Sequence, residues 1–287
     1  MGEKRGYVLA EVSDRPAGEH AVRWAADEAA LRGLALRLIH FREVPDTRPR
    51  HAAPATRAAA WATHLHAREE VLLLEARDTA LRRDPRLEVR TELLRGRPAR
   101  VLREAAASAS LLVLGTPRRS GAASLFEPRD EADALVGHLF CPVVLVREPS
   151  SELPADAPVV VGVGGSPSTA AALDLAFEEA RLRGAGLVAV AVRGSREAGR
   201  EELPAVLARH AERHPGVEVR QEVLTGDPAA MLASASRSAR CLVVGTRGDR
   251  GILGKGGLKD LLYGSTCHTL IHGTDCTLII APLPPRR

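Results

Sequence analysis

An internal repeat is the feature that most constrains the fold of this 287-residue chain. The stretch GRPARVLREAAASASLLVLGT (96–116) aligns without a gap with GDPAAMLASASRSARCLVVGT (226–246), and residues 8–33 align equally well with residues 159–184. Each aligned block contains candidate strands and helices, so each copy encodes one complete supersecondary arrangement. We therefore expect the same domain twice.

Each copy alternates short apolar runs with helical patterns, in the order β-α-β-α-β-α-β-α-β. In the second copy, VVVGV (159–163) precedes a helical stretch that ends in LRG, where Gly184 suits the left-handed end of a helix. Apolar strands of this kind indicate a parallel sheet that is covered on both faces. The prediction is an α/β fold with two tandem, Rossmann-like, five-stranded parallel sheets and helices on both faces.

The two domains are expected at residues 1–148 and 156–287, joined through the Pro- and Ser-containing stretch REPSSELPADAP. The first copy is longer because its middle segment, residues 42 to 94, is larger. The last apolar runs of the copies, residues 142–146 and 277–281, are expected to be edge strands. Since an edge strand exposes unpaired backbone groups, we expect the two domains to pair through these strands.

Composition argues against several classes of partner. Aromatic residues make up only 3% of the chain, the net charge is +4, and no run of five Lys or Arg residues occurs. Neither a base-stacking surface nor a basic patch is indicated, so no nucleic-acid partner is expected. No apolar stretch reaches about 18 residues, and the N-terminal sequence lacks a signal-peptide core. We expect no membrane partner and a cytoplasmic location.

The cysteines and histidines allow two interpretations. Cys267, His268, His272 and Cys276 have the residue types of a zinc site, and the two histidines share one helix face. However, Cys267 lies beside His268 rather than over it, and Cys276 begins an apolar strand. We favour buried thiols with a surface histidine pair, and we assign no metal ligand.

Enzymatic chemistry has little support in the sequence. No His-Asp-Ser or His-Cys grouping falls at the ends of the expected strands, so we assign no catalytic residue and expect a protein that is not an enzyme. His20, His51 and His210 are interpreted as solvated residues of helix faces. A P-loop is excluded because Lys255 is followed by Gly256 rather than by Ser or Thr.

A glycine-rich stretch, GTRGDRGILGKGGLKDLLYGST (245–266), lies where a ligand would bind. Open parallel sheets bind ligands beyond the carboxyl ends of the strands where strand order reverses. The first and fourth strands of a copy usually flank that point, and in the second copy they end near Gly162 and Gly245. Glycine exposes backbone N–H groups, and a following helix N-terminus favours an anion. The stretch therefore predicts a phosphate-binding loop.

These features resemble the universal stress protein family in its tandem two-domain form. The resemblance rests on VVVGVGGSP, on LRG in both copies, and on TGDPA, CLVVGTRG and YGS in the second copy. It implies a parallel sheet of order 3-2-1-4-5. It also implies, for many members, ATP binding through the motif G-x2-G-x9-G-[ST]. Members that lack this motif often bind no nucleotide and act through dimerisation.

The second copy carries this motif in a stretched form. Fifteen residues, rather than nine, separate Gly248 from Gly264, which indicates an insertion of six. Gly164 stands where the family usually has an Asp that hydrogen-bonds the nucleotide. The candidate cofactor is ATP. The candidate cofactor-binding residues are Gly162, Gly164, Gly245, Arg247, Gly248, Gly251, Gly254, Gly264, Ser265 and Thr266.

The first copy has a more degraded version of the same site. Pro117 removes a backbone donor from its loop, and acidic residues precede its last helix where Gly-Ser would stand. Two hypotheses follow. The protein is either a stress-response sensor that binds ATP or a related nucleotide in its second domain, or a non-nucleotide-binding interaction scaffold. The scaffold would act through intramolecular domain pairing, a homodimer or an unknown protein partner.

Overall fold

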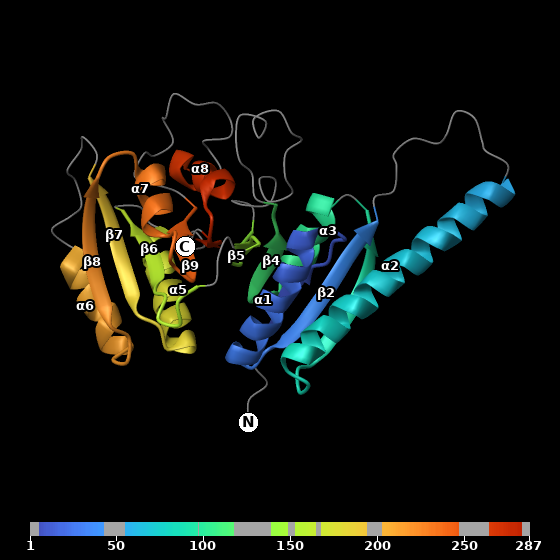
Figure 1. Ribbon diagram of the computed structural model, residues 1–287, viewed down its shortest axis with the longest axis horizontal. Helices are drawn as coiled ribbons and strands as arrows, with labels where there is room; N and C mark the ends of the chain where they lie inside the picture. Colours follow the sequence, from blue (N-terminus) through green and yellow to red (C-terminus); the bar gives the residue numbers. More distant parts are fainter. Residues whose placement is uncertain are drawn as a thin grey trace. The chain divides into compact units, whose positions relative to one another are not determined.

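The expected α/β class is confirmed by a computed structural model of the chain, which divides into two compact units, Met1–Gly115 and Thr116–Arg287. Figure 1 shows parallel strands and flanking helices in each unit. The structure describes residues 6–42, 55–96, 98–117, 139–148, 153–164, 168–193, 203–246 and 264–282.

The first unit contains a four-stranded parallel sheet in the order β3-β2-β1-β4. The helices α1 and α2 pack side by side against this sheet (Figure 1). The strands are β1 (Tyr7–Glu11), β2 (Ala35–Arg42), β3 (Val89–Arg95) and β4 (Leu111–Gly115), and the helices are α1 (Pro16–Arg32), α2 (Ala55–Arg83) and α3 (Pro98–Ala106).

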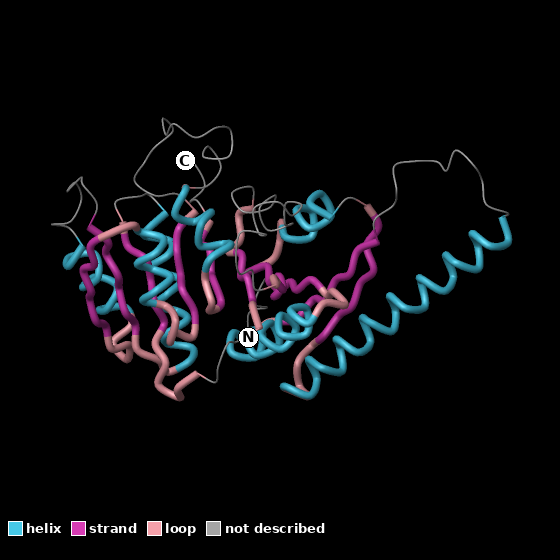
Figure 2. The backbone as a smooth tube through the Cα atoms, turned by 45° about the horizontal axis from the view of Figure 1, so that its top comes forward, coloured by secondary structure: helices cyan, strands magenta, loops and turns pink. Residues whose placement is uncertain are grey.

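The second unit has strands in the order β5-β10-β9-β6-β7-β8, all parallel to their neighbours except β5. Helix α5 contacts α6, and α7 contacts α8, as right-handed crossovers require when the chain moves outward to β8 and then returns to β9. Figure 2 shows these helices in cyan beside the magenta strands. The elements are β5 (Val143–Val146), β6 (Val159–Val163), α5 (Ser168–Arg183), β7 (Leu187–Arg193), α6 (Leu203–Arg213), β8 (Val219–Thr225), α7 (Pro228–Ala235), β9 (Cys241–Gly245), α8 (Ser265–Gly273) and β10 (Thr277–Ala281).

Strand β5 belongs to the first copy by sequence but to the second unit by contacts. It runs antiparallel to β10, with Leu145 opposite Leu278 and Val143 opposite Ile280. This ladder satisfies backbone groups that an edge strand would otherwise leave unpaired. The compact units therefore divide after Gly115 rather than at the linker. The domain boundaries at residues 148 and 156 stay predictions.

The central strands are buried on both faces, as their continuous apolar sequences predict. Cys241 to Val244 of β9 and Val159 to Val161 of β6 are all buried. Phe177 of α5 is fully buried as well, although aromatic residues are rare in this chain. All four cysteines are buried, which confirms the expectation of buried thiols. Strands β6 and β9 and helix α5 therefore contribute to the hydrophobic core of the second unit.

Each copy also buries one carboxylate in its first helix. Glu28 and Glu179 are 0% and 1% exposed, and each pairs with an arginine one turn later, Arg32 and Arg183 respectively. A buried charge is costly unless it is paired, and removal of one partner typically costs several kcal/mol. The duplication has kept this charged pair at the same place in both copies.

The extra length of the first copy lies partly in α2. This helix has 29 residues, whereas α6, its counterpart in the second copy, has 11. At 1.5 Å per residue these lengths are about 44 Å and about 16 Å. In Figure 1 the N-terminal part of α2 extends past the strands that its C-terminal part covers.

The LRG sequences end the first helix of each copy as predicted. Gly33 and Gly184 have φ values of 62° and 59°, in the left-handed region. The N–H of Leu34 donates to the carbonyl of Ala29, and the N–H of Ala185 donates to that of Ala180. Glycine adopts this backbone conformation without the steric strain that a Cβ introduces.

Replacement of Gly184 by alanine should therefore destabilise the protein through backbone strain alone, because nothing lies within 4 Å of the added Cβ. The expected loss in free energy of unfolding is about 1–2 kcal/mol, measured by urea denaturation. Gly216→Ala is the matched control, because Gly216 is equally open but has no positive φ. The control should leave stability unchanged or raise it by about 0.4–1 kcal/mol. Equal losses in both variants would contradict the strain argument.

Candidate functional site

The candidate site lies where strand order reverses in the second unit. β6 pairs with β7 on one side and with β9 on the other, so the chain leaves β6 in one direction and later returns to the opposite side. Two helices begin beside these strand ends, α5 at Ser168 and α8 at Ser265. Helix N-termini carry unpaired N–H groups and partial positive charge. The arrangement therefore suits an anion.

Gly245 lets the first turn of α5 pack against the end of β9. A Cβ at Gly245 would lie 2.2 Å from the Ser168 hydroxyl and 2.7 Å from its Cβ. Gly115, at the same place in the first copy, is equally close to the backbone of Ala17. The first glycine of the expected loop is thus required for close packing of helix on strand. Its role toward a ligand stays a prediction.

The start of α8 is tied directly to the end of β9. The N–H of Gly264 donates to the carbonyl of Thr246 at 2.8 Å, and the carbonyl of Gly264 accepts from the N–H of His268 at 3.1 Å. Gly264 is the N-cap and has no side chain to cap the first turn, while Ser265 is exposed. The structure therefore brings Gly264, Ser265 and Thr266 to the carboxyl end of β9.

Thr246 is a residue of this site that the sequence reasoning missed. It is 3% exposed, and its hydroxyl has no hydrogen-bond partner among the described residues. Thr116 in the first copy is 7% exposed, and its hydroxyl likewise has no partner among the described residues. An unpaired buried hydroxyl costs free energy unless a partner arrives. The repeated GT dipeptide after both fourth strands was the signal available in the sequence.

Gly162 and Gly164 have different surroundings. A Cβ at Gly162 would lie 3.0 Å from Leu232 of α7, so this glycine makes room for core packing. Gly164 is exposed, and no atom of the described residues lies within 4 Å of a Cβ built on it. Its carbonyl accepts a hydrogen bond from the Thr169 hydroxyl at 2.8 Å. The position that would carry the family's Asp is therefore open.

The remaining candidate residues cannot be placed. Arg247, Gly248, Gly251 and Gly254 lie outside the described residues, as does the predicted six-residue insertion. The described part of the site consists of the ends of β6 and β9 and the starts of α5 and α8.

Comparison with known proteins now assigns the family. The sequence model of the Universal stress protein family matches residues 7–147 and 157–282. The chain belongs to the universal stress protein family.

Its relatives span the full length. Universal stress protein Rv2005c of Mycobacterium tuberculosis is 29% identical over 297 residues, which cover 97% of each chain. Universal stress protein Rv2623 of the same organism is 28% identical over 295 residues, which cover 96% of this chain and 95% of the relative. The similarity to these curated members of the family thus extends over both copies of the repeat.

Solved structures show the same fold. A universal stress protein from Archaeoglobus fulgidus superposes with a TM-score of 0.72 at 12% identity and covers 97% of both chains. A putative universal stress protein from Pseudomonas aeruginosa gives a TM-score of 0.60 at 14% identity, with coverage of 97% and 94%. No described helix in this universal stress protein is both long and apolar enough to cross a membrane.

The corresponding region of the first domain is organised differently. Asp14, one residue beyond the usual position of the family's Asp, lies 3.4 Å from the guanidinium of Arg68 on α2, and both side chains are largely exposed. The Nδ1 atom of His40 lies 2.6 Å from the carbonyl oxygen of Val12, the residue that follows β1. An exposed ion pair of this kind contributes little stability. Asp14 is therefore oriented toward α2 in this domain.

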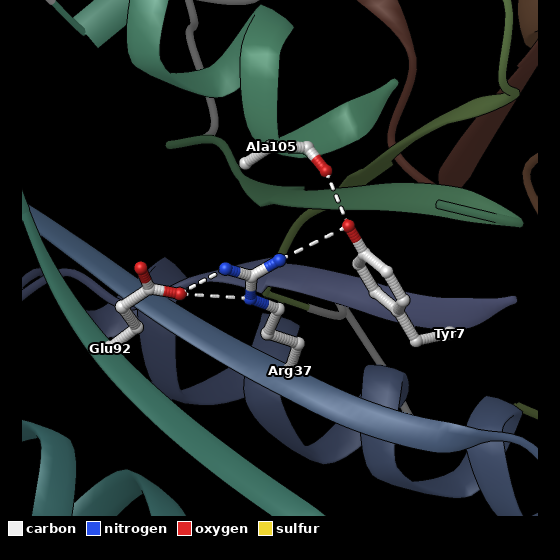
Figure 3. A network of polar contacts seen from close by, with 4 residues as sticks. All are labelled: Tyr7, Arg37, Glu92 and Ala105. Carbon is white, nitrogen blue, oxygen red and sulfur yellow. Dashed lines mark hydrogen bonds and ion pairs between the residues drawn. The ribbon is translucent and has the colours of Figure 1, made fainter. Parts of the chain in front are cut away.

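In the first domain a polar network connects side chains of the neighbouring strands β1, β2 and β3 (Figure 3). The Tyr7 hydroxyl donates to the carbonyl of Ala105 at 2.7 Å and accepts from Arg37 at 3.2 Å. Arg37 also donates to Glu92, and this hydrogen bond raises the pKa of Arg37. In the second domain Val188 stands at the position of Arg37. The network joins three strands to α3 and is structural.

The prediction that His210 is solvated is wrong. His210 is 6% exposed, and its ring stacks on Phe177 at 5.5 Å. Its Nδ1 lies 2.8 Å from the carbonyl of Val206, and its Nε2 lies 3.1 Å from Asp174 of α5. Polarity alone suggested a solvated face, but the imidazole fills the interface between α5 and α6, and its Nε2 makes no hydrogen bond among the described residues. His20 is partly buried, and His51 lies outside the described residues.

The cysteine and histidines of α8 and the cysteine just before β10 are the residues that suggested a zinc site. Cys267 and Cys276 are buried, and the rings of His268 and His272 meet edge to face at 5.0 Å. Burial raises the pKa of the Cys276 thiol. Within the described part of the chain, no group of three or more His, Cys, Asp or Glu side chains is placed to hold a metal ion.

Replacement of Gly245 by alanine should force α5 away from β9, because the new methyl group would overlap Ser168. We expect a loss of about 1–3 kcal/mol in the free energy of unfolding, measured by urea denaturation. Gly164→Ala, at the neighbouring strand end, meets nothing within 4 Å and should change stability by less than about 0.5 kcal/mol. A Gly245→Ala variant as stable as the Gly164→Ala variant would contradict the packing role.

Proposed function

We propose that this universal stress protein is a stress-response protein that binds ATP or a related nucleotide in its second domain. One observation carries the proposal. The N-terminus of α8 is held at the end of β9 by the hydrogen bond from Gly264 to Thr246, and the buried Thr246 hydroxyl beside it has no partner among the described residues. A phosphate oxygen would supply the acceptor that this hydroxyl lacks.

The chemistry of the helix start supports a phosphate rather than a cation. The first N–H groups of α8 lack a capping side chain, and Ser265 adds an exposed hydroxyl. Anions bind favourably at such positions because the N–H groups and the helix dipole both attract negative charge. In this proposal the family motif supplies further backbone donors from Gly248. Gly251 and Gly254 form an alternative pair, because nine residues separate Gly254 from Gly264, as the motif requires.

The proposed affinity is lower than that of a family member with the usual Asp. Gly164 leaves the position open, so one hydrogen bond from a charged group to the nucleotide is missing. Such a bond is worth about 1.5–3 kcal/mol, or about ten- to a hundredfold in the dissociation constant. In this proposal the protein binds nucleotide and does not transform it, and it works in the cytoplasm without a nucleic-acid or membrane partner.

The second candidate function is an interaction scaffold without nucleotide. The antiparallel ladder between β5 and β10 favours it, because β5 comes from the sequence of the first copy. In this proposal the two repeats pair within the chain, and a homodimer or an unidentified protein partner provides the output. Isologous pairing of duplicated domains resembles pairing of identical subunits.

Titration with ATP, ADP and AMP decides between the two candidates. Saturating nucleotide at a hundred times its dissociation constant stabilises the bound state by about 2.7 kcal/mol, which should raise the melting temperature by several degrees. Thr246→Val should leave stability of the free protein unchanged or slightly higher, because it removes an unpaired hydroxyl. The same substitution should weaken nucleotide binding about tenfold. Calorimetric titration measures the dissociation constants.

Thr116→Val is the matched control, since Thr116 is the equivalent buried hydroxyl of the first copy. It should leave nucleotide affinity unchanged. If none of the three nucleotides binds the unaltered protein, the scaffold function is favoured. If Thr246→Val binds as tightly as the unaltered protein, the phosphate is bound elsewhere.

Gly164→Asp should restore the missing hydrogen bond and tighten nucleotide binding about ten- to a hundredfold. A Cβ at this position meets no described atom within 4 Å. Gly164→Ala serves as the control and should not change the affinity. An Asp variant that binds no more tightly than the Ala variant would show that the nucleotide does not approach the end of β6.

A further inference from the structure

Arg147 forms hydrogen bonds at the C-terminal end of α8, the helix whose N-terminus is part of the proposed site. It follows β5 directly, is 5% exposed, and donates to the Thr274 hydroxyl at 2.5 Å and to the carbonyl of Ile271. The Thr274 hydroxyl in turn donates to the carbonyl of Leu270 at 3.0 Å. Two carbonyl groups near the end of α8, those of Ile271 and Leu270, therefore accept hydrogen bonds from a cation and a threonine, respectively. A positive charge at this end also complements the helix dipole.

Helix α8 is short enough for its two ends to move together. It has nine residues, Ser265–Gly273, and so is about 13 Å long. A helix of this length has little stability of its own, and its position depends on what it contacts. Helix α8 contacts α7 and β10. Its polar contacts are the hydrogen bond from Gly264 to Thr246 at its start and Arg147 at its end.

The contribution of Arg147 is specific to one copy. Cys141 and Cys276 open equivalent strands, so the position equivalent to Arg147 is Pro282 in the second copy. Proline has no side-chain donor and cannot make the same contact. An arginine from the first copy thus supports the helix of the second copy, and the second copy cannot return the contact. This asymmetry matches the expected loss of the ligand site in the first copy only.

We propose that Arg147 is a positioning residue for nucleotide binding, which holds α8 so that the N–H groups of its first turn face the phosphate. The inference rests on the proposed function. In this proposal a residue at the end of the first copy's last strand affects the nucleotide affinity of the second copy. In this proposal α8 contacts the phosphate and not the nucleoside. Replacement of Arg147 should therefore leave the affinity for the nucleoside alone unchanged.

The test compares AMP with adenosine on the full-length protein. Arg147→Met should weaken binding of AMP about three- to tenfold and leave that of adenosine unchanged. Hydrogen exchange of the α8 amides should be faster in this variant even without ligand, while exchange in α5 stays the same. Arg147→Lys keeps the charge and should recover part of the AMP affinity. If Arg147→Met does not fold, the same measurements are made on Arg147→Lys, which should then bind AMP more weakly than the unaltered protein.

Arg240→Met is the matched control. Arg240 also donates to backbone carbonyls, those of Ala157 and Ala155, but it is not bonded to α8 in this way. It should leave AMP affinity and α8 exchange unchanged. If the unaltered protein binds AMP and Arg147→Met binds it equally well, the positioning role is overturned while the proposed function stands. If the unaltered protein binds neither AMP nor ATP, the proposed function is wrong and this inference falls with it. Unchanged α8 exchange in Arg147→Met also overturns the inference.

Discussion

The close contact between the end of β9 and the first turn of α5 determines the geometry of the whole site. Gly245 permits it, because any Cβ there would overlap Ser168. Once α5 is seated, Gly164 lies at its start and Thr246 lies one residue beyond the contact. Thr246 then binds Gly264 and so places α8. The missing side chain at Gly245 thus lets α5 begin against β9, and the hydrogen bond from Gly264 lets α8 begin at the same strand end.

Much of this arrangement could be predicted from the sequence, because local patterns encode it. The aligned repeats gave two copies of one fold, the continuous apolar runs gave buried parallel strands, and the LRG sequences gave helix ends at Gly33 and Gly184. Each of these features depends on residues that are neighbours in the chain. The family assignment rests on the same patterns and is confirmed.

Features that depend on contacts between distant residues could not be read in the same way. Thr246 looks like any residue after a strand until its burial without a partner is known. His210 looks like a solvated residue because its polarity was judged without Phe177, which lies more than thirty positions earlier. Arg147 lies in a linker by sequence, and its partner on α8 is more than a hundred residues away. Arg147 and His210 are buried with hydrogen-bond partners on the protein backbone, whereas the buried Thr246 hydroxyl has none among the described residues.

The ladder between β5 and β10 has a consequence for the history of the chain. A duplicated domain whose ligand residues have decayed is ordinarily free to be deleted. Here deletion of the first repeat would remove β5, leave Leu278–Ile280 with one unpaired side, and take Arg147 away from α8. The second unit therefore depends on a strand that the first copy encodes, and separating the copies at the linker would divide one compact unit.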